Sequence, residues 1–307
     1  MSKDYKEPLP VSPVQPVALG LEEKFRFRCH QGIACFNRCC ESIDILLMPY
    51  DIVRLKNRLD VSSREFIDRY TRDSELDAHG MPGLKLAKKP GTSACVFLTA
   101  EGCGVYEDRP SACRYYALGL MAMKKKDTDV EEDAYFVVKE AHCLGHEEAH
   151  TQTVGEYRRE QGVDVYDEKN RDWRRIILKK RSSGPAVGRP SQRSFELFFL
   201  ASYDIDGFRA FVASEGFRRV FELDEGYYAK LLADEDELLA FAHRYLRQVL
   251  YGEQSIALRA DEAARRAAIY QAKLAARATQ SGEDKARQQD EFYESLLDDD
   301  QPGERGE

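Results

Sequence analysis

Residues 28–40 read RCHQGIACFNRCC and place four cysteines within twelve positions of one another. Cysteine returns in residues 94–117, ACVFLTAEGCGVYEDRPSACRYYA, and in residues 142–145, HCLG. All eight cysteines of the 307-residue chain lie in these three segments, and none occurs in the last 164 residues. Cysteines that serve only as small buried hydrophobic residues would be scattered more evenly. The distribution therefore indicates a shared chemical role.

Metal ligation explains the clustered thiols better than disulfides do. An even number of cysteines suits a disulfide framework, but such frameworks are typical of short secreted chains. The first twenty residues contain four prolines and no apolar stretch, so they do not resemble a secretory signal. We therefore predict a cytoplasmic protein that holds an iron–sulfur cluster or zinc. The expected ligands are Cys29, Cys35, Cys39, Cys40, Cys95, Cys103, Cys113 and Cys143.

Eight sulfurs match two four-thiolate sites or one larger cluster. Adjacent side chains in an extended segment point apart. Cys39 and Cys40 are therefore expected to serve two centres, or one of them ligates while the other supports or reacts. Thiolates also need positive charge nearby. Arg109 and Arg114 are predicted to supply it, as cofactor-binding residues beside the cysteines.

The pattern GC-x-x-Y-x-x-RP-x-x-C occupies residues 102–113. With CHQGIACFNRCC, MPYDIVRL and HCLG, it makes residues 25–145 resemble the YkgJ-type cysteine-cluster family, a zinc- or iron-chelating domain with a CxxCxxCC-like motif. Residues 195–252 resemble, more loosely, the C-terminal extension of longer members. The resemblance implies metal or iron–sulfur binding by the cysteines and no defined reaction. Five residues separate Cys29 from Cys35, a wider spacing than in the family's tightest motif, which leaves the role of Cys29 less defined.

Two enzymatic functions are alternatives to plain metal binding. One branch that shares the cluster, the flagellin lysine N-methylases, is an enzyme, so the resemblance allows a protein-lysine N-methyltransferase-like activity. No GxGxxG or GxxxxGK[ST] motif is present, however, and no S-adenosylmethionine site is recognisable. Residues 146–150, HEEAH, formally satisfy the HExxH motif of zinc peptidases, with Glu147 as general base. Their polar flanks favour an exposed turn, and we favour a protein that is not an enzyme.

Histidines beside the cysteines are a further option. His30, His142 and His146 are candidates to complete or tune a mixed Cys/His site.

The pattern of apolar residues predicts an α+β fold. We expect a Pro-rich arm at residues 1–22, a small mixed cysteine-cluster metal-binding domain at 23–180, a linker at 181–194, an all-α domain at 195–280 and a disordered acidic tail at 281–307. Within the cysteine domain, Pro49 should begin a helix. Short strands are expected at residues 43–47, 84–87, 94–98, 104–106 and 134–138, and helices at 153–161 and 167–180.

Charge and hydropathy limit the partners. The net charge is −8, and residues 281–307, with ten acidic and three basic residues, carry −7 of it. The rest of the chain is nearly neutral, so we expect no nucleic acid partner. No apolar run reaches the roughly 18 residues of a membrane-spanning helix. The helical half is expected to act as a scaffold or as a docking surface for another protein.

Overall fold

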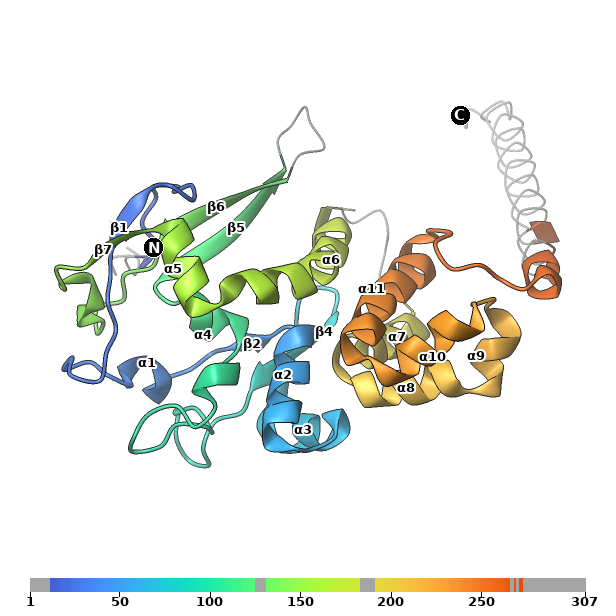
Figure 1. Ribbon diagram of the computed structural model, residues 1–307, viewed down its shortest axis with the longest axis horizontal. Helices are drawn as coiled ribbons and strands as arrows, with labels where there is room; N and C mark the ends of the chain where they lie inside the picture. The colour runs from blue at the N-terminus through green and yellow to red at the C-terminus, as the bar shows by residue number, and fades with distance from the viewer. Residues whose placement is uncertain (1–11, 125–130, 183–190, 266–267, 269–270, 273–307) are drawn as a thin grey trace, which may run out of the picture. The chain divides into compact units, whose positions relative to one another are not determined.

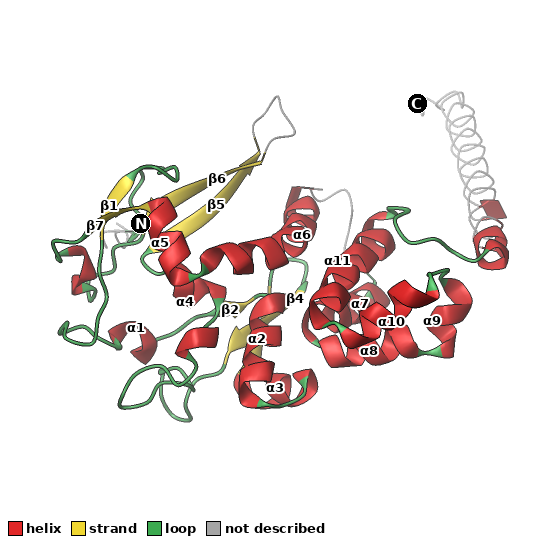
Figure 2. Cartoon of the chain, viewed as in Figure 1, coloured by secondary structure: helices red, strands yellow, loops and turns green. Residues whose placement is uncertain are grey.

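The computed structural model describes residues 12–124, 131–182, 191–265, 268 and 271–272 (Figure 1). The chain divides into two compact units, Met1–Ser214 with Asp224–Ser255, and Glu215–Leu223 with Ile256–Glu307. In the described part of the chain, strands occur only before residue 154 and the segment after residue 191 is helical (Figure 2). The predicted α+β class with a helical C-terminal half is confirmed. The predicted acidic tail, residues 281–307, lies outside the described residues.

The first unit contains small antiparallel sheets. One pairs β1 with β7, one has the strand order β2-β4-β3, and one is the hairpin of β5 and β6. The strands are β1 (Lys24–Arg26), β2 (Leu46–Leu47), β3 (Thr71–Glu75), β4 (Pro82–Leu86), β5 (Leu118–Lys124), β6 (Glu131–Val137) and β7 (Thr151–Thr153). The β1–β7 pair joins the two ends of the cysteine-bearing segment, because Phe25 lies opposite Gln152.

Helix α2 (Pro49–Leu59) begins at Pro49, as the sequence predicted. The backbone NH of Met48 donates to Asp51 Oδ2 at 2.9 Å, which satisfies one amide at this end of the helix. Helix α3 (Ser63–Tyr70) follows, and Ser62 caps it by accepting a hydrogen bond from the Glu65 amide at 3.1 Å. The remaining helices of this part are α1 (Arg38–Glu41), α4 (Ser111–Tyr115), α5 (Val154–Gln161) and α6 (Val163–Ser182).

The helical half contributes to both units. Helices α7 (Gln192–Tyr203), α8 (Ile205–Ala213), α10 (Glu225–Ala233) and α11 (Glu235–Tyr251) belong to the first unit, and α9 (Glu215–Val220) belongs to the second. Trp173 of α6 is buried, lies 6.3 Å from the Phe198 ring, and donates to Ser202 Oγ at 3.0 Å. These contacts fix α7 against α6. Residues 183–190 of the predicted linker lie outside the described residues, and the domain boundaries stay a prediction.

The strands predicted at residues 94–98 and 104–106 are wrong. This stretch holds only isolated bridges, one between Lys88 and Cys95 and one between Leu98 and Cys103. Thr99 and Gly102 exchange backbone hydrogen bonds of 2.7 and 3.4 Å, so the chain turns back within four residues. Gly102 has a φ of 131°, a conformation that glycine adopts without the strain a side chain would bring. The turn brings Cys103 back beside the segment of Cys95.

The helices show no membrane span. Among the residues that the structure describes, none of them combines the length and the apolar character needed to cross a bilayer.

Candidate metal centre

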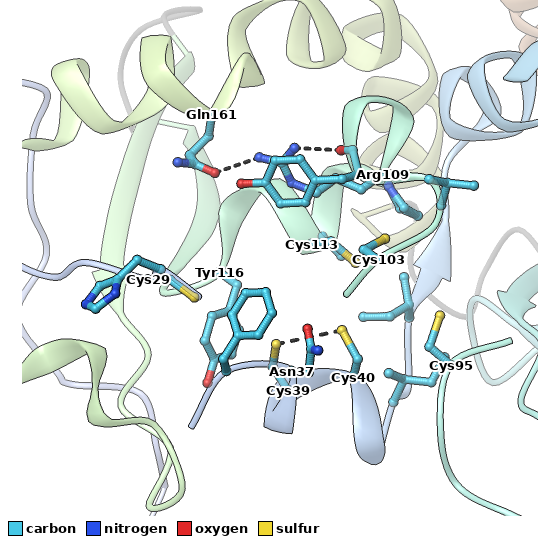
Figure 3. Close-up of a pocket in the computed structure, with 18 of the residues that line it drawn as sticks. Cys29, Asn37, Cys39, Cys40, Cys95, Cys103, Arg109, Cys113, Tyr116 and Gln161 are labelled. Carbon is cyan, nitrogen blue, oxygen red and sulfur yellow. Dashed lines mark hydrogen bonds between the residues drawn. The ribbon is translucent and has the colours of Figure 1, made fainter. Parts of the chain in front are cut away.

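Six of the eight cysteines line one cavity of about 610 Å³ (Figure 3). Figure 3 shows Cys39 and Cys40 on one side of this cavity, with Cys103 and Cys113 across from them. The six lining cysteines are Cys29, Cys39, Cys40, Cys95, Cys103 and Cys113. All eight cysteines are free thiols. The cavity therefore gathers cysteines from two segments that are far apart in sequence, residues 28–40 and 94–117.

Helix α1 presents Cys39 and Cys40 to the cavity together. It is a single turn, which begins after Asn37 in the left-handed conformation at φ 69°. The two sulfurs lie 3.8 Å apart. The prediction that these side chains point apart is wrong, because the pair is helical rather than extended.

The opposite wall is fixed by a buried carboxylate. Asp51 of α2 is fully buried, and its Oδ1 accepts hydrogen bonds from the Ser111 amide at 2.9 Å and the Ser111 hydroxyl at 2.6 Å. Ser111 begins α4, the helix that carries Cys113. Burial raises the pKa of Asp51 to about 6, against the hydrogen bonds from Ser111 and Met48. Asp51 was not predicted as a site residue from the sequence, although it belongs to the quoted MPYDIVRL segment.

The cavity disfavours thiolates that have no cation beside them. Desolvation by the surrounding side chains raises the pKa of Cys29 to about 11 even though the residue is exposed, with further contributions from Cys39, Cys35 and Cys143. Burial also raises the pKa of Cys113 far above its ordinary value, and Cys95 and Cys103 add to the shift. A bound metal supplies the positive charge that converts such thiols into thiolate ligands.

Cys39 is the exception. Its sulfur lies 3.8 Å from that of Cys40, and a hydrogen bond between the two side chains lowers the pKa of Cys39 to about 7 and strongly raises that of Cys40. Cys39 is therefore the thiol in this group that ionises most readily near neutral pH.

The cysteine thiols suit a soft metal, but they stand too far apart to hold a single metal ion. Clustered thiolates select zinc or iron–sulfur clusters over hard cations. Among the described residues, however, no three His, Cys, Asp or Glu side chains are close enough to hold a single metal ion. The thiols fit a metal group by their chemistry, and they surround a space larger than one ion fills.

The two predicted cofactor-binding arginines lie in different places. Arg109 lines the cavity, and its guanidinium donates to the Tyr106 carbonyl and to Gln161 Oε1, both at 2.7 Å. Its charge acts to lower the pKa of Cys103, which burial raises overall. Arg114 does not line the cavity. Its guanidinium donates to backbone carbonyls, among them those of Arg109 at 3.0 Å and Gln161 at 2.7 Å.

The HEEAH segment does not form a peptidase site. Residues Leu144–His146 make one 3₁₀ turn, and the chain enters β7 at Thr151, so His146 and His150 share no helix face. Both ring nitrogens of His146 lie within hydrogen-bond distance of backbone oxygens, at 3.3 Å from Arg26 and 3.1 Å from Val138. The zinc peptidase alternative is therefore wrong, because the tight turn that follows Cys143 prevents the helix that an HExxH site needs.

The other histidines near the cysteines differ in whether they line the cavity. His30 and His150 line the cavity, and His30 Nε2 lies 3.6 Å from Glu148 Oε2. His142 Nε2 lies 3.6 Å from Glu140 Oε2, outside the cavity lining. Of the histidines proposed to complete a mixed site, only His30 faces the cavity.

Aromatic side chains that were not predicted from the sequence form much of the remaining wall. Phe27, Tyr116 and Tyr157 line the cavity. The Tyr157 hydroxyl donates to the Tyr116 carbonyl, and the Phe27 and Tyr157 rings lie 5.9 Å apart. The adjacent tyrosines that follow Cys113 were the available signal.

One comparison with known proteins finds a match for the cysteine-bearing segment. Residues 28–144 match the family model CxxCxxCC, described as "Putative zinc- or iron-chelating domain". The match confirms the family resemblance drawn from the cysteine motifs, and it assigns zinc or iron chelation in general terms to this stretch. No curated protein and no solved structure is significantly similar to the chain.

Proposed function

We propose that the protein binds an iron–sulfur cluster through its clustered cysteines, because residues 28–144 match the model of a zinc- or iron-chelating domain. The observation that carries the proposal is the 610 Å³ cavity lined by six cysteines. A cluster places iron and sulfide atoms between its thiolate ligands, so these ligands stand farther apart than those of a single zinc ion. The wide spacing of the donors favours the cluster over zinc.

In this proposal Arg109 provides positive charge beside the cluster. A cluster with four thiolate ligands carries negative charge, and the potential of such a cluster depends on neighbouring charge and hydrogen bonds. Arg109 is only 8% exposed and lies in the cavity wall, so its cation acts on the cluster with little screening by water. Arg114, in contrast, holds the backbone around α4 in position.

The helical half, as far as the structure describes it, contributes no residue to the cavity. All residues that line the cavity lie between Phe27 and Gln161, so α7 to α11 contribute none of them. We propose that these helices act as a scaffold or as a docking surface for a partner protein. Lysine N-methylation stays a hypothesis of the family resemblance.

The test is anaerobic purification followed by an absorption spectrum and an elemental analysis. We expect a brown protein that contains iron and acid-labile sulfide. Cys113→Ser should lose most of this iron, whereas the matched control Ala112→Ser, which adds a hydroxyl at the neighbouring cavity position, should keep it. A colourless protein with stoichiometric zinc would show that the metal is zinc, and a protein without metal would refute the proposal.

A further inference from the structure

Two of the eight cysteines stand apart from the others. Cys35 and Cys143 do not line the cavity that contains the other six. A single centre that used all eight thiolates would need every sulfur to face one space. The lining of the cavity therefore points to more than one group of ligands.

Four cysteines form a first group, the cavity set, which consists of Cys40, Cys95, Cys103 and Cys113. The Cys95 amide donates to the Cys40 carbonyl at 2.8 Å, and Cys103 returns beside the same segment through its bridge to Leu98. Cys113 faces them from α4. Each of these four residues lines the cavity.

The remaining four cysteines form a second group, the loop set, which consists of Cys29 and Cys39, which also line the cavity, and of Cys35 and Cys143, which do not. The Arg28 amide donates to the Gly145 carbonyl at 3.0 Å, and this pairing holds the segment of Cys29 against the segment of Cys143. The Leu144 amide donates to Cys35 Sγ at 3.3 Å. An amide hydrogen bond to sulfur is one of the interactions that tune thiolate ligands.

Cys39 and Cys40 lie at the junction of the two sets, with their sulfurs 3.8 Å apart. The Cys95 amide donates to the Cys40 carbonyl, and in Figure 3 Cys40 lies between Cys39 and Cys95, on the side of the cavity set. Cys39 lies toward Cys29 in the same view. Since the cavity set has four thiolates without it, Cys39 is left as the fourth ligand of the loop set.

We propose that this chain holds two metal centres, one on the cavity set and one on the loop set, which meet at the adjacent residues Cys39 and Cys40. This inference rests on the proposed metal-binding function and specifies its stoichiometry. The chain changes sets between two successive residues, so both centres are tied to the short helix α1.

The experiment compares the metal content of the full chain with that of two double variants. Cys95→Ser/Cys113→Ser removes half of the cavity set, and Cys35→Ser/Cys143→Ser removes half of the loop set. Ala112→Ser and Ala34→Ser add a hydroxyl beside a ligand in each set and serve as matched controls. Iron, zinc and labile sulfide are measured per chain after anaerobic purification, and circular dichroism identifies any variant that fails to fold.

Two centres predict about eight iron atoms per chain if each holds a four-iron cluster, or about two zinc ions. Each double variant should keep about half of the wild-type metal, and the two together should remove all of it. The wild-type stoichiometry tests the proposal even where a variant fails to fold. About four iron atoms or one zinc ion in the wild type, or complete loss in either folded double variant, would overturn the two-centre inference alone. A wild-type protein without any metal would refute the proposed function as well.

Discussion

Replacing Asp51 with alanine should destabilise the protein by several kcal/mol. Three hydrogen bonds end on its fully buried carboxylate, from the Met48 amide at 2.9 Å, the Ser111 amide at 2.9 Å and the Ser111 hydroxyl at 2.6 Å. A buried donor left without its acceptor costs about 1–3 kcal/mol. Three such donors give about 3–9 kcal/mol, and entry of water into the space would place the result near the lower value.

Urea unfolding of the metal-free protein measures this difference through the midpoint and the slope of the transition. Ser111→Ala is the matched control, because it removes one hydrogen bond and leaves the Ser111 amide bonded to Asp51. We expect it to cost about 1 kcal/mol. Asp51→Ala should also lower metal content, since α4 carries Cys113. If Asp51→Ala unfolds at the same urea concentration as Ser111→Ala, the argument that Asp51 fixes α4 is wrong.

Three further predictions concern single side chains. Burial lowers the pKa of His243 from 6.5 to about 4, so the stability that its neutral form contributes is complete above pH 6.5 and is lost as the pH falls toward 4. Between pH 6.5 and 4 the free energy of unfolding of the wild type should therefore fall by about 3 kcal/mol more than that of His243→Leu. If urea unfolding shows the same pH dependence for both proteins, this prediction is wrong. Cys40→Ala removes the hydrogen-bond partner of Cys39, whose pKa should rise from about 7 toward 9.0. Alkylation of Cys39 at pH 7.5, followed by mass spectrometry on metal-free protein, should then slow several-fold, and an unchanged rate would exclude the hydrogen bond as the cause. Gly145→Ala places a Cβ 2.6 Å from the Phe27 ring, so it should cost about 1–3 kcal/mol in thermal unfolding, and a wild-type melting temperature would show that this packing is loose.

The sequence predicted the elements whose signals are local. Pro49 marked the start of α2, and the apolar pattern located α5 and α6 within a few residues. The concentration of cysteines in one half predicted a common site, and six of them do share a cavity. These signals are strong because each depends on residue type and spacing alone.

The remaining features depend on long-range packing. The side chains of Cys39 and Cys40 point into one cavity because of a single helical turn, which no periodicity over four residues could predict. The HEEAH motif fits a helix by residue type, but Gly145 packs directly against Phe27 and the chain turns into β7. Arg114 was placed at the site from its neighbour Cys113, and the structure turns its guanidinium toward carbonyls that lie up to 47 positions away.

The rim of the cavity is open to the surrounding solution. Cys29 and Cys39 are exposed, and the Tyr106 side chain at the same rim is 54% exposed. Dioxygen, peroxide and small chelators can therefore reach the sulfurs without any opening of the fold, and exposed thiolates are the ones that oxidise first. Access of oxidants at this rim therefore limits how long a bound metal survives in air. Rapid anaerobic handling should preserve more of the metal during purification.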